Sequence, residues 1–270
     1  MSSLVREPAV AGYFYPGKAA PLLRDIHSYV PATGEKVRAL GCVAPHAGYV
    51  YSGHVAGAVY ARLELPRQFV ILCPNHTGMG EPLAIMSHGS WATPLGEAPI
   101  NHDLAAKLKE ACPLLSEDAE AHRTEHALEV HLPFLQALVP DFSFVPIAVG
   151  VGSFPPLATL GEALAALVKA WPEPVLLVSS SDMNHYESDA VTRVKDGKAI
   201  ERMLALDARG LYETVRQEDI SMCGISPTVV MMTAVKRLGA SSAELVKYAT
   251  SGDVSGDRDR VVGYAGILVR

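Results

Sequence analysis

One local pattern most constrains how this chain can fold: an apolar run, then a loop with proline and histidine, then a helical pattern. Residues 39–43 form the apolar run, Pro45 and His46 follow it, and residues 53–63 repeat small and apolar side chains at helical spacing. Because a proline disfavours helical backbone in the residue before it, the run should end there as a strand. The sequence therefore predicts a strand, a loop and a helix, with His46 at the carboxyl end of the strand.

The same arrangement occurs twice more. The apolar residues 68–73 lead to His76, and the apolar residues 174–179 lead to His185. Further strands are predicted over 83–87, 144–149, 244–249 and 261–269, further helices over 20–29, 101–111, 156–170, 189–204, 207–217 and 228–238, and a loop over 89–96. Because strands alternate with helices throughout, we expect one α/β domain over residues 1–270, with helices on both sides of a mixed, largely parallel sheet.

Parallel neighbouring strands would bring the loops that follow them to one rim of the sheet, where ligands bind in open α/β folds. This would gather His46, His76 and His185, together with Cys223, which lies just ahead of the predicted helix over 228–238. Imidazole and thiolate suit zinc, iron or copper, whereas magnesium and calcium prefer oxygen ligands. We predict an open metal site, and we expect the helix dipole to lower the pKa of the Cys223 thiol. The alternative is that each histidine is a structural loop residue.

A second cluster places Glu125, His126, Glu129 and His131 within seven positions. Its spacing differs from the HExxH pattern of metalloproteases, which excludes that class. We predict a helix on which Glu125 and Glu129 share one face and support a nearby site. A solvated helix face is the alternative.

Two further residues have two interpretations each. Asp182 either supports His185 from behind or caps its own turn. Tyr51 either forms part of a pocket wall or is an ordinary half-buried aromatic residue.

Composition excludes several classes of protein. The chain has 270 residues, of which 49% are hydrophobic and 19% charged, so it can bury a sizeable core. A net charge of −6 without a Lys/Arg-rich run argues against a nucleic-acid partner. Residues 142–161 carry no charge, but prolines and glycines interrupt them, which argues against a membrane span. Four cysteines without a CxxC pair, and an N-terminus without the apolar region of a signal peptide, favour a reduced, cytoplasmic protein.

Six ordered motifs resemble the Memo family (mediator of cell motility), and they occupy residues 8–16, 44–53, 74–76, 125–133, 180–186 and 223–224. The resemblance implies a fold similar to that of class III extradiol dioxygenases, non-haem Fe(II) enzymes that open catechol rings. It places His46 and His76 at the two histidine ligands and His185 at the acid/base position. Cys223 then stands where those enzymes have a carboxylate ligand.

Three functions are compatible with these residues and with the family resemblance. The first is a metal-dependent, dioxygenase-like protein that binds Fe(II), with copper or zinc as alternatives, and acts in redox chemistry on an unknown small substrate. A thiolate ligand changes the metal's potential and is itself oxidisable, so ring cleavage is not predicted. The second is a module that binds a peptide or a partner protein in the same cleft, because the resembled family is linked to phosphopeptide binding and, in microbes, to radical-SAM proteins. The third is a Cys223 nucleophile activated by a nearby histidine.

Overall fold

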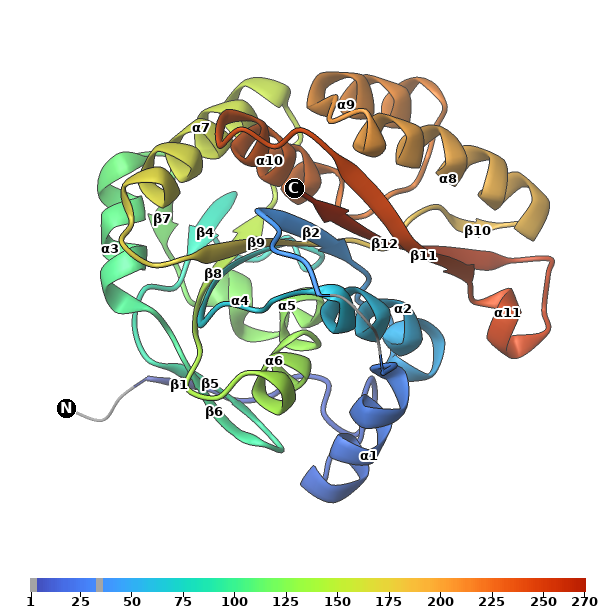
Figure 1. Ribbon diagram of the computed structural model, residues 1–270, viewed down its shortest axis with the longest axis horizontal. Helices are drawn as coiled ribbons and strands as arrows, with labels where there is room; N and C mark the ends of the chain where they lie inside the picture. Colours follow the sequence, from blue (N-terminus) through green and yellow to red (C-terminus); the bar gives the residue numbers. More distant parts are fainter. Residues whose placement is uncertain (1–3, 33–35) are drawn as a thin grey trace.

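A mixed sheet of nine strands forms the centre of the molecule in the computed structural model, which describes residues 4–32 and 36–270 (Figure 1). Eight strands follow one another in the order β10 (His185–Glu187), β12 (Val261–Val269), β2 (Gly41–Ala44), β9 (Val175–Ser180), β3 (Gln68–Pro74), β8 (Ser143–Val149), β4 (Leu83–Ile85) and β7 (Ser116–Glu117). The ninth, β11 (Ala243–Thr250), pairs with β12. This is the mixed sheet that the sequence predicts.

The central strands β2, β9, β3 and β8 are parallel, whereas β4 runs antiparallel to β8, and β12 runs antiparallel to β2, β10 and β11. The parallel strands are almost entirely buried, as expected for strands covered on both faces. Because β9 lies between β2 and β3, the segments that follow these three strands meet at one edge of the sheet.

Helices cover both faces, so the prediction of a three-layer α/β fold is confirmed (Figure 1). One layer contains α3 (His102–Ala111), α7 (Phe154–Ala170), α8 (Asp189–Leu204), α9 (Ala208–Gln217) and α10 (Ile225–Arg237). The other contains α1 (Ala19–Tyr29), α2 (Tyr49–Arg62), α4 (Glu120–Arg123), α5 (His126–Glu129) and α6 (Leu132–Leu138). A short helix, α11 (Gly252–Ser255), lies between β11 and β12. The single-domain organisation over residues 1–270 stays a prediction.

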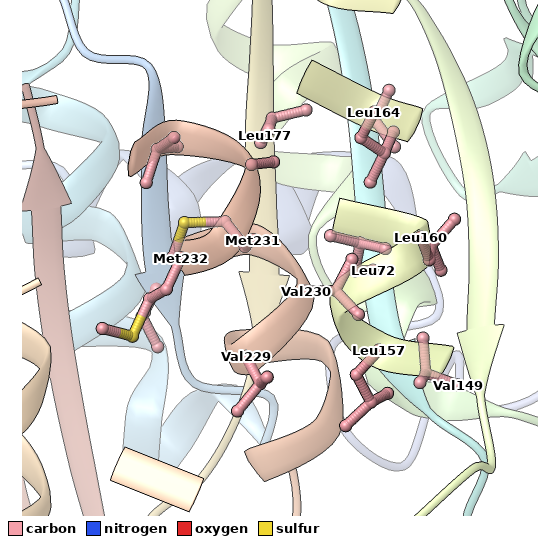
Figure 2. Close-up of a cluster of buried hydrophobic side chains, with 14 of the residues drawn as sticks. Leu72, Val149, Leu157, Leu160, Leu164, Leu177, Val229, Val230, Met231 and Met232 are labelled. Atoms are coloured by element: carbon pink, nitrogen blue, oxygen red, sulfur yellow. The ribbon is translucent and has the colours of Figure 1, made fainter. Parts of the chain in front are cut away.

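The larger core cluster lies under α7 and α10. Figure 2 shows side chains of these two helices gathered with side chains from β3, β8 and β9, among them Leu160, Val230 and Leu177. The helices approach closely because α7 presents Gly161 to α10: a Cβ atom there would lie only 2.7 Å from the carbonyl oxygen of Val230. This packing holds the middle of α10 closely against α7.

Three predicted segments differ from the structure. The helix expected over 53–63 begins earlier, at Tyr49. Residues 89–96, expected to form a loop, belong to the hairpin of β5 (Ser90–Thr93) and β6 (Gly96–Pro99), which joins β1 (Val5–Arg6) in a second, three-stranded sheet. The helix expected over 228–238 begins earlier, at Ile225, because Pro227 sits in the first turn, where its missing N–H is not needed.

The uncharged residues 142–161 form β8, a loop and the first part of α7, as the sequence analysis expects. Within the described ranges, none of the helices combines the length and the apolar character that crossing a membrane requires.

Candidate metal centre

A cavity of about 620 Å³ opens at the carboxyl edge of β2, β9 and β3. Its lining includes six residues that the sequence analysis singled out: His46, His76, His126, Asp182, His185 and Cys223. The parallel order of the three strands thus brings together the loops that the sequence predicted to meet.

His46 follows β2 and is held from three sides. Its backbone N–H donates to Asp182 Oδ1 at 2.8 Å, its Nδ1 lies 2.7 Å from Ser180 Oγ, and its Nε2 lies 3.2 Å from Cys223 Sγ. Burial lowers the pKa of His46 well below its ordinary value, and the neighbouring histidines lower it further. His46 is therefore a neutral imidazole.

His76 follows β3 and is fixed by the buried carboxylate of Glu125. The His76 Nδ1 lies 2.9 Å from Oε1 of Glu125, and its backbone N–H donates to Oε2 at 2.6 Å. Burial acts to lower the pKa of His76, but the hydrogen bond and charge of Glu125 outweigh burial and raise it. Burial likewise acts to raise the pKa of Glu125, which His76 and the N–H of Ala127 bring below its usual range. Because a carboxylate only accepts, Nδ1 of His76 carries a proton, and Nε2 is the nitrogen that is unprotonated when the ring is neutral.

Cys223 lies one residue before Gly224, the N-cap of α10. Its sulfur accepts the backbone N–H of Asp182 at 3.3 Å. Burial, with the nearby Asp182 charge, raises the pKa of the Cys223 thiol well above its ordinary value. The expectation that the helix start lowers this pKa is wrong, because desolvation of the thiolate outweighs the backbone hydrogen bonds near α10.

Ligand atoms of His46, His76 and Cys223 all lie within 4.8 Å of one another. Two imidazoles and one thiol form a donor set that suits iron, copper or zinc. A second group, His76, Glu125 and His126, is equally close. It is less suited to a metal, because the Glu125 oxygens already accept three hydrogen bonds and the His126 ring stacks on His76.

His185 faces the same cavity from the start of β10. Its backbone N–H donates to Ser221 Oγ at 2.8 Å, and its Nδ1 lies 2.9 Å from the carbonyl oxygen of Ser221. A carbonyl oxygen only accepts, so Nδ1 carries the proton. Burial lowers the pKa of His185, which leaves a neutral ring whose Nε2 can accept a proton.

Asp182 supports two of the predicted ligands, since it binds the backbone of His46 and the sulfur of Cys223. Burial raises the pKa of its carboxyl group to about 7, against the N–H groups of His46 and Ala47 and the charge of His76. The first interpretation of Asp182 placed it behind His185. The structure places it behind His46 and Cys223 instead.

The predicted helix around residues 123–133 is three short helices, α4, α5 and α6. Glu125 caps α5, where its side chain accepts the N–H of Ala127, and Glu129 lies at the end of α5. The prediction that the two carboxylates share a helical face is therefore wrong. Glu129 turns away from the cavity, where its carboxylate is buried against the guanidinium of Arg6 and the hydroxyl of Tyr15.

The structure also places the two remaining predicted residues, His131 and Tyr51, outside the cavity lining. His131 is buried behind the cavity, where its Nε2 lies 2.9 Å from Ser180 Oγ. Tyr51 is 41% exposed on α2 and is not brought into the cavity lining.

Sequence reasoning missed several cavity residues, namely Phe14, Ser221, Tyr186, Val262 and Tyr264. Phe14 comes from the N-terminal aromatic segment, and its ring lies 4.8 Å from that of His126. Its carbonyl oxygen also accepts the N–H of Tyr49 at the start of α2. The run of aromatic residues from Tyr13 to Tyr15 was the available signal, but it does not indicate which ring reaches the cavity.

Known proteins are similar to this chain over nearly its whole length. A family model described as Memo-like protein matches residues 6–268. The chain is 42% identical to the MEMO1 family protein MK0963 of Methanopyrus kandleri, over 98% of this chain and 99% of that protein. MEMO1 family proteins of Archaeoglobus fulgidus and Thermotoga neapolitana are 43% and 40% identical to it, each over 98% of this chain and 100% of the relative.

Among solved structures, the crystal structure of the uncharacterized protein JW3007 from Escherichia coli K12 has a similar fold. It aligns with a TM-score of 0.57 and 14% sequence identity, over 86% of this chain and 100% of that one. At this identity the likeness concerns the fold alone.

Proposed function

The chain belongs to the Memo family, and on this premise we propose that its cavity binds one transition-metal ion through His46, His76 and Cys223 for redox chemistry on a small molecule. The observation that carries the proposal is the approach of three ligand atoms to within 4.8 Å of one another. Fe(II) is the proposed metal, on the family's resemblance to non-haem iron enzymes, and copper and zinc suit the same donors.

The protonation states of the residues around the cavity are compatible with binding of a metal ion. His46 is neutral, and the Glu125 carboxylate leaves the Nε2 of His76 as its free nitrogen. His46 therefore offers its Nε2 lone pair directly, whereas His76, whose pKa is raised, would release any Nε2 proton on binding. Carboxylate support behind a ligating histidine is typical of metal sites. Cys223 would bind as the thiolate, so it would release its proton on binding. A bound iron or copper ion would supply Lewis acidity and one-electron chemistry.

His185 would move a proton within the cavity. The Ser221 carbonyl holds its Nδ1–H, so the ring keeps one orientation while Nε2 accepts a proton from the substrate and later returns it. Phe14, Val262 and Tyr264 supply apolar wall to the cavity. A cavity of about 620 Å³ is within the size range of sites for small organic molecules.

Elemental analysis of protein purified without oxygen tests the proposal. Wild type should carry near-stoichiometric iron, copper or zinc, and His46→Ala and Cys223→Ser should both lose it. His88→Ala is a matched control, because His88 is an exposed histidine outside the cavity lining. Folded wild type without metal, or metal retained in both cavity variants, would contradict the proposal.

A second candidate function is a module that binds a peptide or a partner protein in the same cleft. Tyr186 favours it, because this cavity residue is 65% exposed and adopts a left-handed backbone (φ 63°), which is uncommon for a residue other than glycine. Capture of a peptide that weakens in both His46→Ala and His185→Ala, in protein without metal, would support this candidate over the first. The radical-SAM partner implied by the resemblance stays a prediction.

A further inference from the structure

A chain of hydrogen bonds runs from the Nδ1 atom of His46 through Ser180 and His131 to Tyr60. We propose that Ser180, His131 and Tyr60, here called the Ser180 relay, are positioning residues that hold His46 as its Nδ1–H tautomer. This inference rests on the proposed function, because the Nε2 lone pair that the tautomer leaves free is the one that would bind the metal.

The Ser180 hydroxyl is the junction of the relay. Its Oγ hydrogen-bonds the carbonyl oxygen of Ala127, lies 2.7 Å from His46 Nδ1 and lies 2.9 Å from His131 Nε2. A hydroxyl has one proton and two acceptor lone pairs, and a backbone carbonyl only accepts. The Ser180 proton must therefore go to Ala127, so both histidines donate to Ser180.

Tyr60 completes the assignment at the far end. Because His131 carries its proton on Nε2, its Nδ1 is an acceptor, and the Tyr60 hydroxyl lies 2.9 Å from it. Burial lowers the pKa of His131 to about 3, so the ring is neutral and has a single N–H. Every donor in this arrangement then has an acceptor.

The opposite tautomer of His131 would leave one buried acceptor, the Ala127 carbonyl, without a donor. If His131 carried its proton on Nδ1, its Nε2 would need the Ser180 proton, and the Ala127 carbonyl would face an oxygen that cannot donate to it. The side chains of the relay and His46 are at most 2% exposed, so bulk water cannot supply the missing partner. An unmade buried hydrogen bond costs about 1–3 kcal/mol, which favours the fully paired arrangement.

The relay gathers residues from separate parts of the fold. Ser180 ends β9, His131 lies between α5 and α6, and Tyr60 belongs to α2. The His46 ring is thereby set by the scaffold rather than by its own loop, with Nε2 held 3.2 Å from Cys223 Sγ. Support of this kind behind a metal-binding histidine typically changes metal affinity by about 10–100-fold.

Nuclear magnetic resonance on the metal-free protein tests the relay directly. Long-range correlation of ring protons with ¹⁵N identifies the protonated nitrogen of each histidine, with the His46 signals assigned from His46→Ala. We expect Nδ1–H at His46 and Nε2–H at His131. Ser180→Ala should convert His46 to a mixture of tautomers, and Tyr60→Phe should do the same at His131. Ser179→Ala is the matched control, because Ser179 is an equally buried serine on β9 that pairs with Thr228 instead.

Zinc titration of the same variants separates this inference from the proposed function. Zinc affinity should fall about 10–100-fold in Ser180→Ala and stay unchanged in Ser179→Ala. An Nε2–H tautomer at His46 in wild type, or identical His46 spectra for the two serine variants, would overturn the relay. The expected tautomers without zinc binding in wild type would support the relay and count against the metal site.

Discussion

Asp196 lies on α8 with its carboxyl group fully buried. Its Oδ2 accepts the hydroxyl of Tyr248 at 2.6 Å, and its Oδ1 accepts the backbone N–H of Asn184 at 2.8 Å. Burial is the largest influence and raises the pKa of Asp196 to about 7; Glu187 adds to the rise, whereas the two donors and Arg193 oppose it. The folded protein therefore keeps a proton that the unfolded chain releases near pH ~4.

This shift predicts how stability depends on pH. Between about pH 4 and pH 7 the folded state binds more protons than the unfolded state, so Asp196 makes the free energy of unfolding fall as pH rises, by at most about 1.4 kcal/mol per pH unit. Asp196→Asn should flatten the slope measured by urea unfolding between pH 5 and pH 7.

Asp189→Asn is the control for this prediction. A hydrogen bond from Arg193 is the main reason that the pKa of Asp189 is lowered to about 2, so its contribution to stability is complete above about pH 4 and is lost only at lower pH. This variant should lose stability equally at pH 5 and pH 8. An unchanged slope in Asp196→Asn would contradict the assignment.

At the level of residues, the sequence was sufficient to identify the candidate ligands but not their chemical state. His46 and His76 could be predicted because each follows a buried strand, with a proline at or just after the end of that strand. The raised pKa of Cys223 could not, because it depends on burial by segments distant in the sequence. Ser180 was visible only as part of a polar loop, since its partners His131 and Tyr60 come from other elements.

Among the helices, α1 and α2 cross where α2 has a glycine. A Cβ atom on Gly57 would lie 2.3 Å from the carbonyl oxygen of Tyr29, the last residue of α1, and backbone cannot yield as a side chain can. Gly197, within α8, has open space around the same position. The two glycines therefore differ in packing although both are inside helices.

Alanine at these two positions should act in opposite directions. Gly57→Ala should destabilise the protein by about 1–3 kcal/mol, since overpacking outweighs the gain in helix propensity. Gly197→Ala should stabilise it by roughly 0.5–1 kcal/mol, because only the propensity changes. Urea unfolding measures both, and a stabilised Gly57→Ala would show that α1 can move away from α2 at little cost.

Element type was predictable where the pattern was long and regular, as in the strand before His76 and the helix over 189–204. It failed for residues 89–96, where glycines and a proline within eight positions indicate a loop. There Trp91 packs under the guanidinium of Arg6, and β5 pairs with β1 from the N-terminus. A strand whose partner is so distant in the sequence gives little local signal.

At the scale of the whole molecule, the order of the strands creates the site. β9 separates β2 from β3, so the segment after β9 supplies Asp182, which holds the backbone of His46 and the sulfur of Cys223. The sequence indicated parallel neighbours but not their order, because order depends on contacts across the whole sheet. It likewise gave no sign that the N-terminal segment would place Phe14 in the cavity.

X-ray absorption at the zinc edge of zinc-loaded protein tests the central claim, that two imidazoles and the Cys223 thiolate hold one ion. We expect one sulfur neighbour at about 2.3 Å and at least two nitrogen neighbours at about 2.0–2.1 Å. Cys223→Ser should remove the sulfur neighbour, and His76→Ala should remove one nitrogen. A bound zinc ion with no sulfur neighbour in wild-type protein would contradict the account.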